Sequence, residues 1–315
     1  MVYPSMVEEE RYIQSMLESD EKFISRLETL YDEAQDDVQG TIDQFIVRNV
    51  RDDKISYTEA RLPADLNDRY KLLRNLENTR SKDLSSYVER DIIYSMNNPN
   101  LTRLQLLDNH IYLNIGKLDT QQNQLFEEYL TNIFTDEYLR QHNNLGFTPT
   151  AEQYDNIART IVHESFNGAE WSQRLNAHSG QLRRDLFSHV QRTVLSGKHP
   201  SQGVRDIAKE IKKSYTGRKN LSALQQAKML AVTEAGRVQT AVQKYSYEKY
   251  DITEFEFIGE PSACDKCSRL IGKTFKTTEL EAGVNACPIH PRCRCSTIPK
   301  INREDWEERM KERGL

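Results

Sequence analysis

The placement of the cysteines constrains this chain more than any other feature of its sequence. All five lie between Cys264 and Cys295 of 315 residues, as a Cys-x-x-Cys motif and, further on, the run Cys-Pro-Ile-His-Pro-Arg-Cys-Arg-Cys. An odd and tightly clustered set of cysteines argues against a disulfide framework. The pattern indicates either a metal site or free thiols.

The two cysteine-rich motifs carry the donor types that zinc prefers. Zinc takes four soft or borderline donors at tetrahedral positions, and a Cys-x-x-Cys turn supplies two of them. The candidate metal ligands are Cys264, Cys267, His290, Cys293 and Cys295. Cys293 and Cys295 are alternatives for the fourth position, because two residues apart in an extended segment they would face the same side. Cys287 is interpreted as a bystander, with a role as a fifth donor left open.

The size of the carboxyl-terminal segment favours metal over free thiols. Residues 251–300 contain few large apolar side chains, and units this small usually need a covalent or metal staple. A structural zinc ion contributes on the order of 10–16 kcal/mol of apparent binding energy. We therefore predict structural zinc as the cofactor, with buried free cysteines and a transient disulfide as the alternatives.

The same motifs do not predict a catalytic centre. Catalytic zinc keeps an open coordination position beside a carboxylate or histidine that acts as a base. Glu260, Asp265 and Glu279 are near in sequence, but nothing fixes any of them as a base. The chain is therefore expected not to be an enzyme, and no catalytic residue is assigned.

Before the cysteines the sequence has the periodicity of helices. From about residue 8 to residue 142, apolar residues recur at three- and four-residue spacings between charged ones. A linker at 142–150 precedes further helices, one of which is expected to begin at about Gln181. Ser222 and Gln225 form a candidate capping box at the start of a long helix.

The spacing of apolar residues changes after this helix. Thr253–Ile258 alternates polar and apolar residues, which is the period of a half-buried strand. We predict a mainly α fold with a helical N-terminal region (1–145), a helical middle region (146–250), a small C-terminal α/β zinc-binding-type module (251–300) and a charged tail (301–315). The tail is expected to be a short, exposed helix.

The charge balance limits the partners that the chain can bind. With 43 basic and 48 acidic side chains the formal net charge is -5, whereas a protein that coats DNA would be far more basic. One local segment is basic, and its candidate nucleic-acid-binding residues are Lys209, Lys212, Lys213, Arg218 and Lys219. These side chains would contact phosphates without reading sequence; the alternative is a solvated helix end and loop.

The sequence contains no signal for a membrane. No stretch reaches the ~20 apolar residues that a membrane helix needs. The acidic amino end lacks the charged-then-apolar pattern of a signal peptide. We therefore expect a protein that folds in the cytoplasm and does not bind a membrane.

The cysteine-rich motifs resemble those of a known family. Mu F-like phage head-morphogenesis proteins end in a Cys-x-x-Cys, a glycine a few residues later and a His-Pro-x-Cys-Arg-Cys signature. Here these elements stand as Cys264–Cys267, Gly272 and His290–Cys295. Weaker similarity extends upstream to Trp171-Ser-Gln-Arg, so the resemblance covers about residues 169–299.

Some positions depart from the family pattern. Val232 replaces the usual arginine before Thr233-Glu234. Ile271 replaces an aspartate common before the glycine, and Cys287 stands where proline is commoner. Any role of the missing arginine or aspartate cannot be carried over, but the signature cysteine and histidine positions are intact.

The resemblance implies a minor capsid protein that is associated with the portal and acts in head assembly, with DNA packaging or ejection as a further expectation. It implies the portal protein and other head proteins as partners, and a place in the virion, inside or beside the head, after assembly in the host cytoplasm. DNA bound without sequence specificity is a further expected partner, through the basic segment. Two alternatives stay open: a zinc-dependent nuclease-like enzyme, and a zinc-knuckle module that binds nucleic acid. The second would use Lys266, Arg269, Lys273, Phe275, Arg292 and Arg294.

Overall fold

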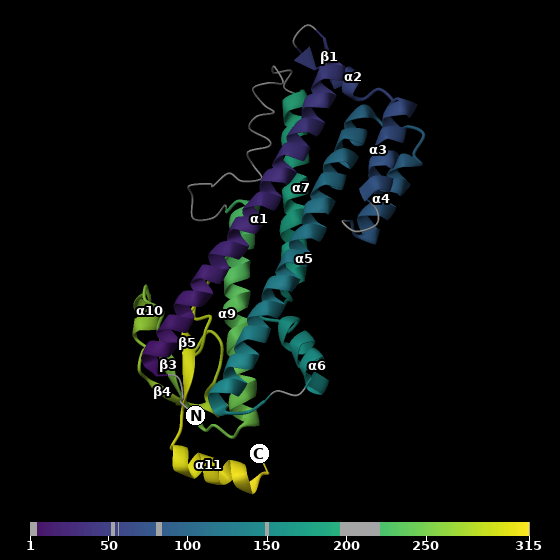
Figure 1. The fold of residues 1–315 in the computed structure, drawn as a ribbon. Coiled ribbons are helices and arrows are strands. Elements are labelled where there is room, and N and C mark those ends of the chain that lie inside the picture. The colour runs from purple at the N-terminus through teal and green to yellow at the C-terminus, as the bar shows by residue number, and fades with distance from the viewer. Residues whose placement is uncertain are drawn as a thin grey trace. The chain divides into compact units, whose positions relative to one another are not determined.

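The computed structural model describes residues 5–51, 54–55, 57–79, 84–148, 151–195 and 221–314. Helices dominate this part of the chain, which confirms the predicted mainly α fold (Figure 1). The longer helices are α1 (Met6–Asn49), α3 (Leu66–Thr79), α4 (Ser86–Met96), α5 (Arg103–Leu145), α6 (Ala151–Val162), α7 (Trp171–Leu195), α9 (Ala223–Lys249) and α11 (Arg303–Glu312). The short elements are β1 (Val50–Arg51), β2 (Lys54–Ile55), α2 (Tyr57–Ala60), β3 (Glu254–Ile258), α10 (Asp265–Ser268), β4 (Thr274–Lys276), η1 (Thr277–Glu279) and β5 (Ser296–Lys300).

The chain forms two compact units, each assembled from segments that are far apart in the sequence. Unit 1 consists of Met1–Ile24, Phe126–Trp171 and Lys228–Leu315, and unit 2 consists of Ser25–Leu125 and Ser172–Ala227. Helices α1 and α5 each contribute residues to both units. The cysteine-rich module therefore shares unit 1 with the beginning of the chain.

Unit 2 is built from helices that bury apolar stripes and a few bonded polar groups. One apolar cluster joins α3, α4 and the start of α5: Leu72, Leu76, Val88, Ile92, Met96, Leu101, Leu106 and Leu113. The hydroxyl of Tyr31 donates to Gln122 Oε1 at 2.9 Å, and Gln122 Nε2 donates to Ser179 Oγ at 2.7 Å. These bonds link α1, α5 and α7, and they satisfy the amide of Gln122, which is fully buried.

Unit 1 contains the three-stranded antiparallel sheet β4-β3-β5. The central strand β3 confirms the strand predicted from the alternation at 253–258. Phe255 and Phe257 are fully buried, as expected for the apolar face of such a strand. Phe255 lies opposite Phe275 of β4 and Pro299 of β5.

Helix α9 begins where the sequence predicted. Ser222 Oγ accepts a hydrogen bond from the backbone N–H of Gln225 at 3.2 Å, so it caps the first turn of α9. Ala231, Ala235 and Val238 are each fully buried. The small-residue stripe of this helix is therefore packed core.

Two helices differ from the expectation. Helix α7 begins at Trp171 rather than near Gln181, and Trp171 itself is 2% exposed, because its ring stacks on Phe126 at 5.7 Å. The charged tail forms a helix, α11, as expected, but it is not solvated all round. Trp306 and Met310, four residues apart on one face, are buried, and Trp306 Nε1 donates to the carbonyl of Tyr250 at 2.7 Å.

Candidate metal centre

Two tight turns of unit 1 present the candidate ligands. Cys264 directly precedes the single helical turn α10, and its carbonyl accepts the backbone N–H of Ser268 at 2.8 Å. The carbonyl of His290 accepts the backbone N–H of Cys293 at 3.1 Å. Both turns are thus closed by main-chain hydrogen bonds, which limits the movement of the donors that they carry.

The five candidate ligands form two overlapping groups. The donor atoms of Cys264, Cys267 and His290 all lie within 4.8 Å of one another. Those of Cys267, Cys293 and Cys295 do so as well. Because Cys267 belongs to both groups, the structure brings the five residues into one cluster that could hold a metal ion.

The imidazole of His290 is oriented as a ligand would be. Its Nδ1 lies 2.9 Å from the carbonyl oxygen of Pro291, which is the usual partner of an Nδ1–H. Its Nε2 is buried and has no hydrogen-bond partner in the structure. A buried polar atom without a partner is costly, so this nitrogen fits a metal-ligating lone pair that points into the cluster.

The spacing of the sulfurs also fits zinc. A tetrahedral site with Zn–S bonds of about 2.3 Å separates its sulfurs by about 3.8 Å. The Sγ atoms of Cys267 and Cys293 are 3.8 Å apart. The two turns therefore approach each other at the distance that a shared tetrahedral metal requires.

The thiols of the cluster differ in how readily they ionise. Hydrogen bonds from the thiols of Cys287 and Cys295 lower the pKa of Cys293 to about 2. The backbone N–H of Cys267 lowers the pKa of the exposed Cys264. Burial, together with the charge of Cys293, raises the pKa of Cys267 to about 12. The negative charge of the Cys293 thiolate thus disfavours ionisation of a second buried thiol. A divalent cation would offset this repulsion.

Cys287 touches the cluster without joining either donor group. It is fully buried, and its Sγ donates to the carbonyl oxygen of Cys293 at 3.0 Å. Burial raises the pKa of this thiol. Cys287 therefore supports the second turn as a neutral thiol, a contact that sequence spacing does not reveal.

Helix α9 binds the His290–Cys293 turn and the start of β5 through polar side chains. Thr233 Oγ1 accepts the backbone N–H of Arg292 at 3.1 Å. Gln239 and Gln243 each donate from Nε2 to Ser296 Oγ at 2.9 Å. Gln239 and Gln243 are four residues apart and fully buried, so they share one face of α9, whereas Thr233 is half-buried. Polar side chains of α9 thus bind residues 292–296. The sequence showed these polar residues but not their burial.

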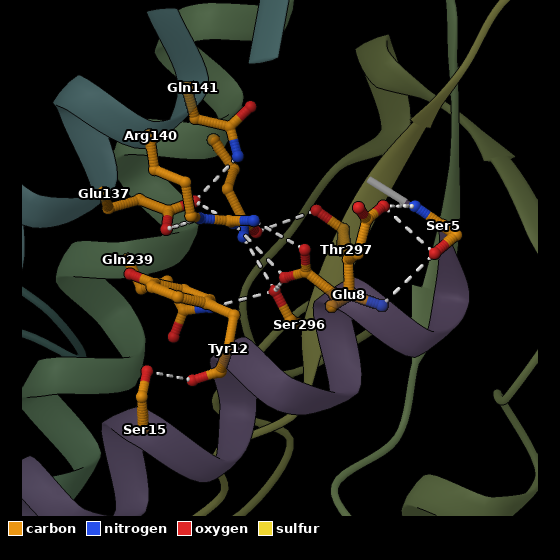
Figure 2. Close-up of polar contacts among 12 residues, drawn as sticks. Ser5, Glu8, Tyr12, Ser15, Glu137, Arg140, Gln141, Gln239, Ser296 and Thr297 are labelled. Carbon is orange, nitrogen blue, oxygen red and sulfur yellow. Dashed lines mark hydrogen bonds and ion pairs between the residues drawn. The ribbon is translucent and has the colours of Figure 1, made fainter. Parts of the chain in front are cut away.

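Helix α1 contacts the same strand from another side. Ser296 Oγ donates to the buried carboxylate of Glu9, and Arg140 NH1 of α5 donates to Glu9 Oε2 at 2.6 Å. Arg140 also pairs with Glu137 at 2.8 Å. Figure 2 shows Arg140 and Glu137 reaching from α5 toward Ser296, with Gln239 of α9 beside them. Ser296, the residue that follows Cys295, thus contacts α9 and α1 directly, and α5 reaches it through Glu9.

The acidic residues considered as catalytic bases do not join the cluster. Among the described residues, neither donor group contains a carboxylate. Asp265 and Glu279 are exposed, whereas Glu260 is half-buried. Burial and the nearby Cys293 raise the pKa of Glu260. Of the three acids, Glu260 is therefore the one that is near the cluster, and it belongs to neither donor group.

The two sets of candidate nucleic-acid contacts have different outcomes. Lys209, Lys212, Lys213, Arg218 and Lys219 lie outside the described residues. Around the cysteines, Arg294 is fully buried and its Nε lies 3.0 Å from Asp20 Oδ2, so it cannot reach a nucleic acid. Phe275 packs into the core of unit 1. Lys266, Arg269, Lys273 and Arg292 remain on the surface.

Comparison with known proteins identifies part of the chain. No helix among the described residues is long and apolar enough to cross a membrane. Neither the curated proteins nor the solved structures contain a match to this chain. Residues 187–298 match the family described as Phage Mu protein F like protein. This segment includes α9, β3, β4 and the whole cysteine cluster, so the region that contains the candidate metal centre is similar to the Mu F-like proteins of phages.

Proposed function

We propose that this chain is a minor capsid protein that acts in the assembly of a phage head. The observation that carries the proposal is the coincidence of the Mu F-like match at residues 187–298 with the cysteine cluster. The portal protein and other head proteins are the partners that fit this role, and the virion, inside or beside the head, is its location. A part in DNA packaging or ejection would follow from the same position.

The module is proposed to hold one structural zinc ion. Cys264, Cys267, His290 and Cys293 are the four ligands, because Cys293 lies at a tetrahedral sulfur spacing from Cys267. Bound zinc would join the two turns and supply folding energy that the small sheet lacks. Cys295, whose thiol hydrogen-bonds to Cys293, would support this ligand from outside the tetrahedron.

A structural role, not a catalytic one, fits the composition of the cluster. Cysteine-rich shells are typically closed, and catalytic zinc needs an open position beside a general base. The nearest acidic candidates stand outside both donor groups among the described residues. The proposed work of the protein is therefore to present surfaces to other head proteins.

Metal content and head incorporation together test this proposal. Full-length protein purified without chelator should contain about one zinc per chain, by elemental analysis. Cys267→Ser and Cys293→Ser should each lose the metal and reduce the amount of protein in assembled heads. Cys287→Ser should keep both, because a serine hydroxyl can donate to the same Cys293 carbonyl. Cys295→Ser should also retain zinc.

The outcomes separate the two parts of the proposal. Purified wild-type protein without any metal would refute the zinc site. Zinc loss in Cys295→Ser with retention in Cys293→Ser would show that the fourth ligand is misassigned. Heads that assemble with normal yield and infectivity when the gene is deleted would refute the role in the head.

A further inference from the structure

The residues from Cys293 to Ser296 face alternately toward the cluster and away from it. The thiols of Cys293 and Cys295 lie with that of Cys267. The side chains between and after them, Arg294 and Ser296, contact residues of α1. This alternation is the ordinary property of extended backbone. The position of the α1 contacts is therefore fixed by the same backbone that positions the candidate ligands.

Two buried carboxylates of α1 depend on these contacts. Asp20 is 4% exposed, and its Oδ2 lies 3.0 Å from Arg294 Nε, as an ion pair without an aligned hydrogen bond. Its other oxygen accepts the hydroxyl of Tyr129. Glu9 is fully buried, and it accepts from Ser296 and from Arg140. Each acid sits in an enclosed site, where loss of one of these partners leaves the charge less compensated.

Apolar contacts complete the attachment of the same helix segment. Ile13 and Met16, between the two acids, pack on Ile258 of β3, with Ile298 of β5 beside them. Ile258 lies opposite Ser296 in the sheet register. The amino-terminal segment, residues 6–24 of α1, therefore rests on the strand that continues from the cluster, by polar contacts at both ends and apolar contacts in the middle.

We propose that metal occupancy of the cluster holds the amino-terminal segment of α1 on the sheet of unit 1, and that loss of the metal releases this segment. The inference rests on the metal site of the proposed function. Without the metal, the Cys293–Cys295 backbone loses its fixed position, and Arg294 and Ser296 lose their register with Asp20 and Glu9. Asp20 then loses its paired cation and keeps the Tyr129 hydroxyl, while Glu9 keeps Arg140 but loses its bond to the strand. The contacts that hold the helix segment on the sheet are thereby weakened, and the segment is released.

Hydrogen exchange of the full-length protein, with zinc and after treatment with a chelator, tests the release directly. Backbone amides of residues 9–20 should exchange about tenfold faster or more after zinc removal. Amides of α3 and α4, in unit 2, serve as the internal reference and should not change. Unchanged protection of residues 9–20, while residues 254–300 lose theirs, would overturn the proposal and leave the zinc site intact.

A variant on α1 tests the coupling without touching a ligand. Asp20→Asn removes the carboxylate charge opposite Arg294 and should accelerate exchange in residues 9–20 while zinc is still bound. If zinc strengthens docking of the segment, docking must strengthen zinc binding by the same factor, because linkage is reciprocal. A variant that weakens docking should therefore have a lower zinc affinity. Glu21→Gln, the neighbouring exposed acid, is the matched control and should leave both measurements unchanged.

Three other results would contradict the coupling between zinc and the α1 segment or the metal site itself. Wild-type zinc affinity in Asp20→Asn, measured by competition with a chelator, would overturn the coupling. Equal loss of protection throughout α9 after zinc removal would overturn it too, because the whole unit would then unfold and no selective release would exist. Absence of zinc from the wild-type protein would instead refute the metal site on which the inference rests.

Discussion

Gly236 of α9 packs directly against the thiol of Cys287. A β-carbon added to Gly236 would stand 2.7 Å from Cys287 Sγ and 2.9 Å from the carbonyl oxygen of Cys293. Both distances are shorter than carbon atoms tolerate, and the second contact is with backbone that cannot rotate away. The lack of a side chain at this one position therefore lets α9 approach the cluster.

Gly236→Ala should destabilise unit 1 and weaken zinc retention. Overpacking of this kind typically costs about 1–3 kcal/mol, which outweighs the roughly 0.5–1 kcal/mol that alanine gains over glycine in a helix. Chemical denaturation with zinc release as a second signal measures both effects. Gly40→Ala on α1 is the control, because nothing lies within 4 Å of its added carbon, and it should stabilise. Equal stabilisation by both substitutions would contradict the packing argument.

Arg237 connects α9 to the end of α6. Its Nε donates to Glu234 at 2.6 Å, and its NH1 and NH2 donate to the carbonyls of Ile161 and Val162 at 2.8 and 3.0 Å. Arg237→Ala should cost about 3–5 kcal/mol, because it removes the cation that pairs with the buried Glu234 and the donors to two backbone carbonyls. Urea unfolding measures the loss. Arg90→Ala, whose side chain is 76% exposed, should cost less than about 0.5 kcal/mol. Similar small losses for both would show that the buried pair is not needed.

Stability of unit 2 should depend on His110 at mildly acidic pH. Burial lowers the pKa of His110 to about 4, so the folded state keeps the imidazole neutral where the unfolded state takes up a proton. The contribution of His110 to the free energy of unfolding therefore has its full value above about pH 6.5, and it decreases as the pH falls toward 4. The loss between pH 7 and pH 5 should be about 2 kcal/mol.

Unfolding free energies of His110→Gln at the two pH values check this expectation. The variant should show a flatter pH dependence than the wild type. The slope should not vanish, because burial also lowers the pKa of His178. A slope equal to that of the wild type would contradict the assignment to His110.

Substitutions of the acids near the cluster distinguish an assembly protein from an enzyme. Glu260→Gln, Asp265→Asn and Glu279→Gln should each leave particle yield and infectivity nearly normal, because these residues lie outside both donor groups. Loss of a catalytic acid or base would cost ~10²–10⁴ in rate, whereas an exposed carboxylate usually changes stability by less than about 0.5 kcal/mol. A variant that is folded, zinc-loaded and normally incorporated but non-infectious would favour the enzyme alternative.

Patterns that depend on near neighbours were readable in the sequence. The helical periodicity predicted the mainly α fold, the alternation at 253–258 predicted β3, and Ser222 marked the start of α9. The spacing of the cysteines and His290 selected five residues that the structure places in one cluster. These features were predictable because hydrogen bonding and side-chain direction within a turn or strand are set by the next few residues.

Other features depend on partners that are distant in the sequence. Gln239 and Gln243 look like surface residues of a helix, and they are buried because Ser296, more than fifty residues away, binds them. Glu9 and Asp20 stand in a charged amino-terminal helix, and only the fold brings Arg140 and Arg294 to them. The start of α7 and the burial of Trp306 were missed for the same reason. The sequence by itself determined most of the secondary structure and selected the candidate donors, because both follow from local spacing. The tertiary structure alone decided which polar groups are buried, because burial of a charge is tolerated only where a distant partner compensates it.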